Sequence, residues 1–151
     1  MADLVERLRS SPAPTSTVQD GFRILLGAAL VFAGISHLTF SRTEFLAQVP
    51  GWVPIDADLV VVLSGAAEIA LGAALVLLVR HRVVVGLIAA AFFVAIFPGN
   101  VSQFVDGDDG FGLDTDTARA VRLGFQPLLV AWALWSTGAW TALRTTIAPR
   151  S

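Results

Sequence analysis

Four long apolar runs fill most of this chain, and short polar or charged segments separate them. The runs are Phe22–Phe40, Asp58–Val79, Val83–Val105 and Val121–Leu143. As a helix rising about 1.5 Å per residue, each run is long enough to cross a hydrocarbon core of about 30 Å. None shows the alternation of a barrel strand. The pattern predicts an all-α, polytopic membrane protein, a bundle of four transmembrane helices.

The composition supports a lipid bilayer as the main partner. Hydrophobic residues make up 55% of the 151 residues and charged residues 15%, against about 45–50% and about 25% in soluble domains. The chain has no cysteine, which excludes disulfides, thiol chemistry and cysteine-ligated metals. No basic patch indicates nucleic-acid binding.

The basic residues predict the orientation of the bundle. They gather before the first run, between the second and third, and after the fourth: Arg7, Arg9, Arg23, Arg80, Arg82, Arg144 and Arg150. The other two connections hold most of the acids. By the positive-inside rule, both termini are cytoplasmic and the protein is integral to the plasma (inner) membrane. Residues 1–20 and 144–151 are then cytoplasmic tails around a transmembrane domain over 21–143.

Glu68 is the only acidic residue inside any of the runs. Insertion scales put an ionised carboxylate at a cost of roughly 2.5–3.5 kcal/mol, so it persists with a partner, a bound proton or a wet cavity. Three more polar residues are expected at a similar depth near the outer ends of their runs, namely His37, Asn100 and Gln126. These four residues predict one polar pocket in the outer half of the bundle.

The arginines and tryptophan near the outer surface extend this pocket as candidate ligand-binding residues. Arg119 and Arg122 precede Gln126 on one helical face. They could snorkel to the interface, or Arg122 could turn inward and pair with Glu68. Trp52 is expected in a short interfacial turn.

Two prolines make the local backbone uncertain from sequence alone. Pro98–Gly99 predicts a bend or break before Asn100, either lining a cavity or capped by Asn100. Pro127 either kinks a helix that begins near Thr117 or occupies the first turn of a helix that begins at Gln126.

The polar residues have structural explanations as well as functional ones. Glu68 could lock the bundle through an Arg or His, and small neighbours such as Gly65 and Gly72 favour a plain helix packing seam. His37 could bond a backbone carbonyl, or exchange protons with a carboxylate as a catalytic pair with Glu68. A metal site is not expected, because the only other histidine, His81, belongs to the opposite membrane face.

Five blocks together resemble the DoxX-like family of small four-helix membrane proteins. In order they are AGISHLTF (Ala33–Phe40), VPGWVP (Val49–Pro54), SGAAEIALG (Ser64–Gly72), FPGNV (Phe97–Val101) and RLGFQP (Arg122–Pro127). The resemblance implies a subunit of a quinone-linked or terminal-oxidase-type redox complex. It also implies that His37, Glu68, Asn100 and Gln126 are the polar positions of the family.

Three hypotheses of function follow from the residues and the resemblance. The first is an accessory subunit of a quinone-linked or redox-stress membrane complex, rather than a self-sufficient enzyme, whose pocket binds a quinone or another small amphipathic molecule. Glu68 and His37 would exchange protons with the ligand, and Asn100 and Gln126 would donate to its carbonyl oxygens. The alternatives are a non-catalytic scaffold or assembly factor and a proton-coupled carrier, which would require a homo-oligomer.

Overall fold

The computed structural model describes residues 14–46, 48–107 and 115–147, and every regular element in these ranges is helical. The elements are α2 (Thr17–Leu38), α3 (Arg42–Leu46), α4 (Ala57–Leu77), a 3₁₀ turn η1 (Val79–His81), α5 (Arg82–Asp106), α6 (Asp116–Ser136) and α7 (Ala139–Ile147). The predicted all-α class is confirmed.

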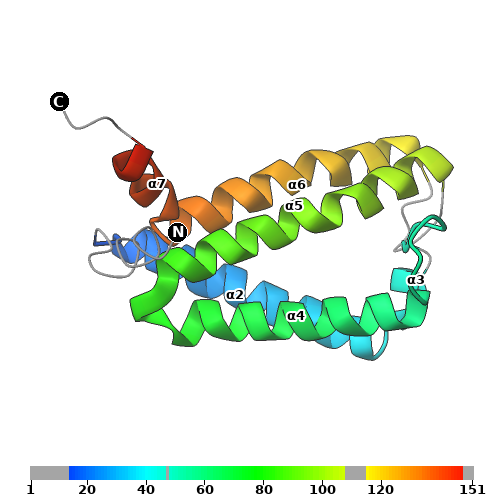
Figure 1. The fold of residues 1–151 in the computed structure, drawn as a ribbon, viewed down its shortest axis with the longest axis horizontal. Coiled ribbons are helices and arrows are strands. Elements are labelled where there is room, and N and C mark those ends of the chain that lie inside the picture. The colour runs from blue at the N-terminus through cyan, green and yellow to red at the C-terminus, as the bar shows by residue number, and fades with distance from the viewer. Residues whose placement is uncertain (1–13, 47, 108–114, 148–151) are drawn as a thin grey trace.

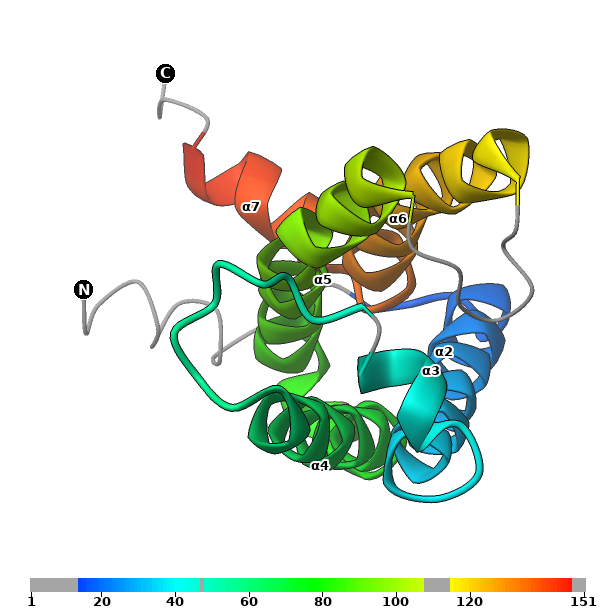
Figure 2. The same cartoon turned by 90° about the vertical axis from the view of Figure 1, so that its right-hand side faces the viewer.

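The long helices form two antiparallel pairs (Figure 1). Helix α2 packs mainly on α4, and α5 packs mainly on α6, with fewer contacts between the pairs. Seen along the bundle, the α2/α4 pair and the α5/α6 pair form two layers, and α3 lies at the near end (Figure 2). Helix α2 begins and helix α6 ends at the end of the bundle away from α3, which we call the terminal end. We call the end that carries α3 the α3 end (Figure 1).

Local side-chain caps explain where three of the helices begin. Ser16 Oγ accepts from the Gln19 backbone N–H, and Gln19 Oε1 accepts from the Ser16 N–H, forming a capping box at α2. Asp56 caps α4 by accepting from Leu59 N at 3.1 Å, and Thr115 caps α6 by accepting from Ala118 N at 3.2 Å. These caps satisfy N–H groups that the helix itself leaves unpaired.

Glycines allow the backbones of α2 and α4 to touch. A Cβ added at Gly34 would lie 2.5 Å from the Gly65 carbonyl oxygen, and one added at Gly72 would lie 2.5 Å from the Gly27 carbonyl oxygen. No side chain fits in these spaces, so the two pairs of glycines form a close seam between the helices.

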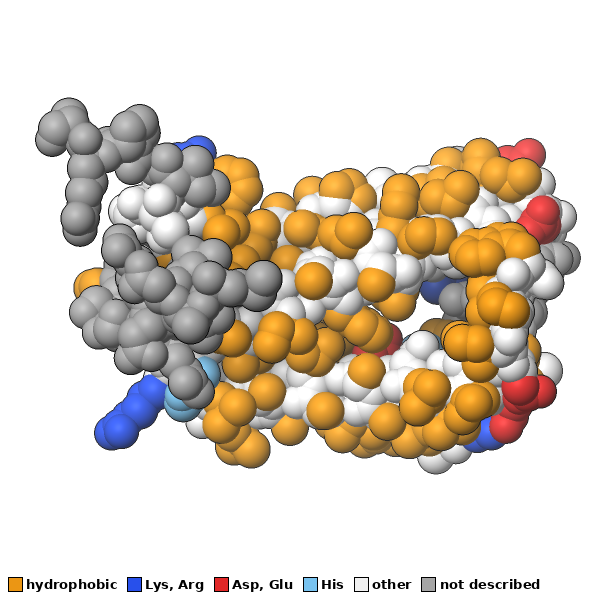
Figure 3. Space-filling model, viewed as in Figure 1, with side chains coloured by type: hydrophobic (Ala, Val, Ile, Leu, Met, Phe, Trp, Pro, Cys, Tyr) orange, Lys and Arg blue, Asp and Glu red, His pale blue; other side chains and the backbone are white. Residues whose placement is uncertain are grey.

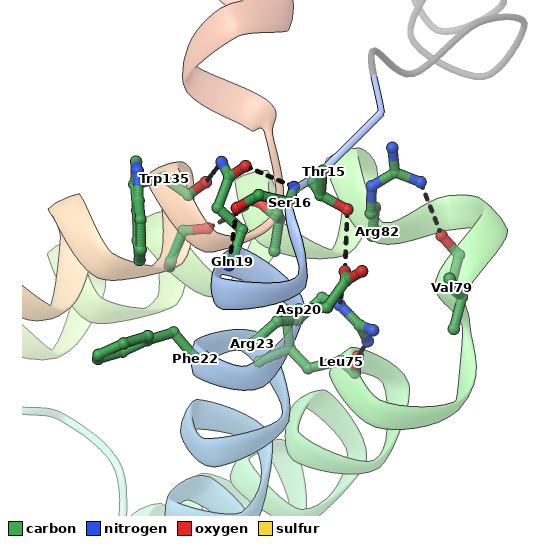
Figure 4. A network of polar contacts seen from close by, with 12 residues as sticks. Thr15, Ser16, Gln19, Asp20, Phe22, Arg23, Leu75, Val79, Arg82 and Trp135 are labelled. Atoms are coloured by element: carbon green, nitrogen blue, oxygen red, sulfur yellow. Dashed lines mark hydrogen bonds and ion pairs between the residues drawn. The ribbon is translucent and has the colours of Figure 1, made fainter.

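The terminal end is packed and cross-linked by hydrogen bonds to the backbone (Figure 4). Arg23, only 3% exposed, donates to the Leu75 carbonyl near the end of α4 and lies 3.5 Å from Asp20. Gln19 Nε2 donates to the Trp135 carbonyl at 2.8 Å, and Trp132 Nε1 donates to the Phe22 carbonyl at 2.9 Å. These bonds tie α2 to both α4 and α6.

Three of the described helices are long and apolar enough to cross a membrane: Thr17–Leu38, Ala57–Leu77 and the continuous stretch Val79–Asp106. They correspond to the first three predicted spans. Helix α2 begins at Thr17, before the predicted span at Phe22, so the last residues of the predicted N-terminal tail are helical.

The fourth predicted span, Val121–Leu143, is not one helix. Helix α6 ends at Ser136, Gly138 adopts a φ of 75°, and α7 then leaves the bundle at an angle (Figure 1). Helix α6 runs beside α5, yet it is not among the three long apolar helices. Its first turns carry Asp116, Arg119 and Arg122, which lower its mean hydropathy.

The helix bounds decide where each proline lies. Helix α5 continues through Pro98 to Asp106, so the helix is not broken there and Asn100 is part of it, while a bend at Pro98 stays a prediction. Helix α6 begins at Asp116, so Pro127 lies in its interior. The predicted acidic loop of residues 106–117 falls partly outside the described residues.

Candidate functional site

A cavity of about 640 Å³ lies between the two helix pairs towards the α3 end. Figure 3 shows the face between α4 and α5 hollowed there, with acidic and basic side chains visible inside a largely hydrophobic surface. Six of the seven predicted site residues line the cavity, namely His37, Trp52, Glu68, Asn100, Arg122 and Gln126. Leu26, Leu30, Phe92 and Phe93 are among the apolar residues that line the rest.

Glu68 and His37 form a buried pair across the α2–α4 seam. The His37 Nδ1 atom lies 2.9 Å from Glu68 Oε2, and each side chain is 9% exposed. The same Nδ1 lies 2.9 Å from the Ala33 carbonyl oxygen. Two oxygen atoms within 2.9 Å of Nδ1 favour the tautomer with a proton on Nδ1, and that single proton cannot point at both.

The carboxylate is therefore only partly satisfied. Glu68 Oε2 is buried and makes no hydrogen bond of good geometry within the described part of the chain. Phe45 of α3 stacks on the His37 ring with an interplanar angle of 16°. The His37 ring thus contacts both Phe45 and the Glu68 carboxylate, and both His37 and Glu68 line the cavity.

Asn100 and Gln126 form a hydrogen-bonded chain that ends on the backbone. Gln126 Nε2 donates to the Phe93 carbonyl at 2.7 Å, and Asn100 Nδ2 donates to Gln126 Oε1 at 2.9 Å. A carbonyl can only accept, so Phe93 fixes the orientation of the Gln126 amide, and Gln126 in turn fixes that of Asn100. In this series of hydrogen bonds, Asn100 Oδ1 receives no hydrogen bond from the described residues.

Arg122 turns inward, as one sequence interpretation held, but Glu68 is not its partner. It donates to Gln103 Oε1 at 3.0 Å and to Gln48 Oε1 at 2.5 Å, while the ion pair of Glu68 is with His37. The guanidinium of Arg122 joins α6 to α5 and to the segment after α3. Snorkelling towards the interface stays a prediction.

Arg119 is the one predicted site residue that does not line the cavity. Its side chain is 8% exposed and lies 2.9 Å from the Asp116 carboxylate, one turn earlier on α6. Trp52 does line the cavity, but its side chain is 68% exposed. Arg119 is thus a structural residue of the α6 N-terminus, and Trp52 lies at the rim.

An exposed ion pair holds helix α3 against α4 at the surface. Arg42 of α3 binds Asp58 of α4 through two hydrogen bonds of 2.8 and 2.5 Å. The hydrogen bond to the Asp58 carboxylate raises the pKa of the Arg42 guanidinium. This pair is exposed, so it stabilises the position of α3 weakly.

The sequence matches one family profile, a domain of unknown function, DUF8561, over residues 26–137. This is well over half of the chain. The chain belongs to this family. No match was found among curated proteins or among solved structures. The resemblance to DoxX-like proteins stays a prediction, because the DUF8561 match does not test it.

The DUF8561 region contains the whole cavity. The lining residues extend from Leu26 to Leu129, inside the matched residues 26–137, whereas the capping box of α2 and helix α7 fall outside them. The cavity is thus built entirely by the DUF8561 domain.

The cavity of this DUF8561 domain opens sideways, through the apolar part of the bundle. Ala95 and Pro98 of α5 both line it and are exposed at the surface. Ala95 lies near the middle of α5, roughly 16 Å from its Asp106 end at about 1.5 Å per residue. The opening therefore reaches the depth of the apolar helix centres, and the exposed Trp52 marks the part of its rim near the α3 end.

The sequence interpretation missed three polar or aromatic contacts of the site. Gln103 follows Asn100 by three residues, a spacing that places both on one helical face and could have been noticed. Gln48 and Phe45 lie in the irregular segment around α3, where no periodic pattern gives the direction of a side chain. Within the described ranges, no group of three or more His, Cys, Asp or Glu side chains could hold a metal ion.

Proposed function

We propose that this protein binds a small amphipathic molecule from the membrane, as an accessory subunit of a quinone-linked or redox-stress complex. The observation that carries the proposal is the lateral cavity, whose lining is mostly apolar and whose few polar groups include a buried, partly unpaired carboxylate. Its volume of about 640 Å³ falls in the range of roughly 300–1,000 Å³ typical of small-molecule sites.

The membrane setting makes an amphipathic ligand the best fit. We infer that α6 completes a four-helix bundle in the plasma membrane and that both termini are cytoplasmic, because Arg23, Arg80, Arg82 and Arg144 belong to the terminal end. The opening beside Ala95 then faces lipid. A molecule with an apolar tail and a compact polar head could pass from the bilayer to Glu68 without crossing water.

The residues fit a quinone-type ligand only in part. The cavity accommodates an apolar ring, and the Glu68–His37 pair could hold or move a proton at the head of the ligand. Asn100 and Gln126, the donors expected for quinone carbonyls, each direct one N–H of the amide to another part of the protein, Gln126 and the Phe93 carbonyl respectively. The unpaired Glu68 carboxylate beside them favours a ligand that donates a hydrogen bond.

A cavity-filling variant tests the proposal. Ser64 lines the cavity on α4, and Ser64→Leu would fill part of it; Ala66→Leu, on the exposed side of the same helix, is the matched control. Purified protein in lipid nanodiscs should bind a decyl-substituted benzoquinone/hydroquinone couple saturably. Ser64→Leu should abolish the binding, and Ala66→Leu should retain it. Absence of saturable binding to the unmodified protein would exclude the proposed ligand site.

The subunit role is tested by isolation in a mild detergent. We expect a membrane redox enzyme to co-purify with the protein, and Ser64→Leu to impair the activity of that complex without releasing the protein from it. A scaffold without a ligand is the second candidate, favoured by the glycine seam between α2 and α4. For a scaffold, Ser64→Leu would leave both assembly and activity of the complex unchanged.

A further inference from the structure

We infer that the cavity selects molecules whose head group carries a hydroxyl donor, so that a phenol or hydroquinone binds in preference to the matching ether or quinone. This inference rests on the proposed function, because it concerns the same cavity. It begins from the hydrogen-bonding direction of the polar atoms that line it. Two of these atoms, Glu68 Oε2 and Asn100 Oδ1, are acceptors that receive no hydrogen bond within the described residues, whereas the unpartnered donor Gln48 Nε2 belongs to the segment after α3.

Glu68 provides the first acceptor. As a carboxylate it offers only lone pairs, it is nine-tenths buried, and its Oε2 has no hydrogen bond within the part of the chain that the structure describes. The nearby proton on His37 Nδ1 is shared with the Ala33 carbonyl oxygen at the same distance of 2.9 Å. A ligand hydroxyl would supply the donor that Glu68 lacks.

Asn100 provides the second acceptor. The Phe93 carbonyl fixes Gln126 as a donor towards the backbone, and this makes Asn100 a donor towards Gln126. These hydrogen bonds run in one direction, from Asn100 to Gln126 and from Gln126 to the Phe93 carbonyl. The amide oxygen that remains is again an acceptor, on a residue that lines the cavity.

The strongest donor at the cavity is already engaged. Arg122 directs Nη1 to Gln103 and Nη2 to Gln48, towards the α3 end and away from Glu68. A ligand carbonyl or ether oxygen placed beside Glu68 would therefore meet another acceptor. A buried acceptor left without a donor weakens binding by roughly tenfold or more.

A pair of probes that differ only in the donor tests this inference without redox chemistry. They are 4-nonylphenol and 4-nonylanisole, in which a methyl ether replaces the hydroxyl. Tritium-labelled probes are titrated into nanodiscs that contain the protein, expressed as mole fraction in the lipid, and binding to empty nanodiscs is subtracted. We expect the phenol to bind at least roughly tenfold more tightly than the ether.

Glu68→Gln is the decisive variant, because it keeps the size of the side chain and adds an N–H donor. It should reduce the preference for the phenol to less than about threefold, since the amide can serve either probe. Asp106→Asn removes an exposed carboxylate that does not line the cavity and should leave the preference unchanged.

The outcomes separate this inference from the proposed function. Equal binding of both probes to the unmodified protein, or tighter binding of the ether, would overturn the donor preference and leave the ligand site in place. A preference that survives Glu68→Gln intact would also overturn it, because another group would then be responsible. Binding of neither probe nor of the quinone couple would overturn both proposals.

Discussion

The terminal end and the α3 end of the bundle bury polar side chains in opposite ways. At the terminal end, the buried Arg23 and the half-buried Gln19 donate to backbone carbonyls of neighbouring helices. At the α3 end, Glu68 Oε2 and Gln48 Nε2 have no hydrogen bond within the described residues, and both residues line the cavity. Arg23 Nε and Ser136 Oγ, in the packed region, also lack a hydrogen bond within the described residues, but neither residue lines the cavity.

This difference separates stability from function within one small fold. A side chain that completes the backbone hydrogen bonding of a neighbour stabilises the bundle. A buried carboxylate without a full set of donors destabilises it and is retained at sites of binding or catalysis. Variants at the two ends should therefore change stability in opposite directions.

The largest effect is expected from Gly72→Ala, in the packed half of the α2–α4 seam. The added Cβ would lie 2.5 Å from the Gly27 carbonyl oxygen and 2.9 Å from the Val31 nitrogen, both backbone atoms. We expect the free energy of unfolding to fall by about 1–3 kcal/mol, measured by thermal unfolding in detergent. Gly124→Ala, where an added Cβ meets open space, should be neutral or stabilising, by up to about 1 kcal/mol.

The next effect is expected from Arg23→Met, which tests the hydrogen bonding of the terminal end. It would leave the Leu75 carbonyl without its side-chain donor and should lower the free energy of unfolding by about 1–2 kcal/mol. Arg80→Met, at an exposed position of the same end, is the control. If the two variants unfolded at the same temperature, the buried Arg23 side chain would contribute no more to stability than the exposed Arg80 side chain does.

The opposite sign is expected for Glu68→Gln at the α3 end. The amide can still accept from His37, and no buried charge remains, so stability should be unchanged or rise by up to about 1 kcal/mol. Thermal unfolding of the ligand-free protein beside Asp106→Asn measures the difference. A clear loss of stability in Glu68→Gln would mean that the carboxylate locks the bundle, as the structural interpretation holds.

The smallest effect is expected for Asp58→Asn, which breaks the surface ion pair between α3 and α4. The Arg42–Asp58 pair is exposed, so the unfolding temperature should fall slightly at low salt and converge with that of the unmodified protein at high salt. Titration of salt at constant protein concentration checks this. A large effect that persists at high salt would show that α3 contributes to the core.

The fold was predictable where the hydropathy pattern ends sharply. The start of α4 and both ends of α5 agree with the predicted spans within about one residue, because charged residues or glycine bound them. The break after Ser136 was missed although Gly138, which ends the helix in a left-handed conformation, is a common signal for a helix end. Apolar residues on both sides of that glycine concealed it.

The candidate site was predictable as a set of residues but not as a network. The depth of polar residues along helices identified six of those that line the cavity. Their partners depend on helix rotation and on the irregular segment near α3, which periodicity cannot provide. Arg122 illustrates this, because its partner Gln48 lies 74 positions away in a segment without helical periodicity.

The glycine seam has a mechanical consequence for the Glu68–His37 pair. Both residues belong to the α2/α4 layer, whose backbones meet at Gly34 and Gly65, and a Cβ at Gly65 would lie 2.8 Å from His37 Cβ. The α5/α6 layer forms the facing wall of the cavity. Substitutions in that wall would change the cavity volume while the carboxylate and the imidazole keep their spacing on the other layer.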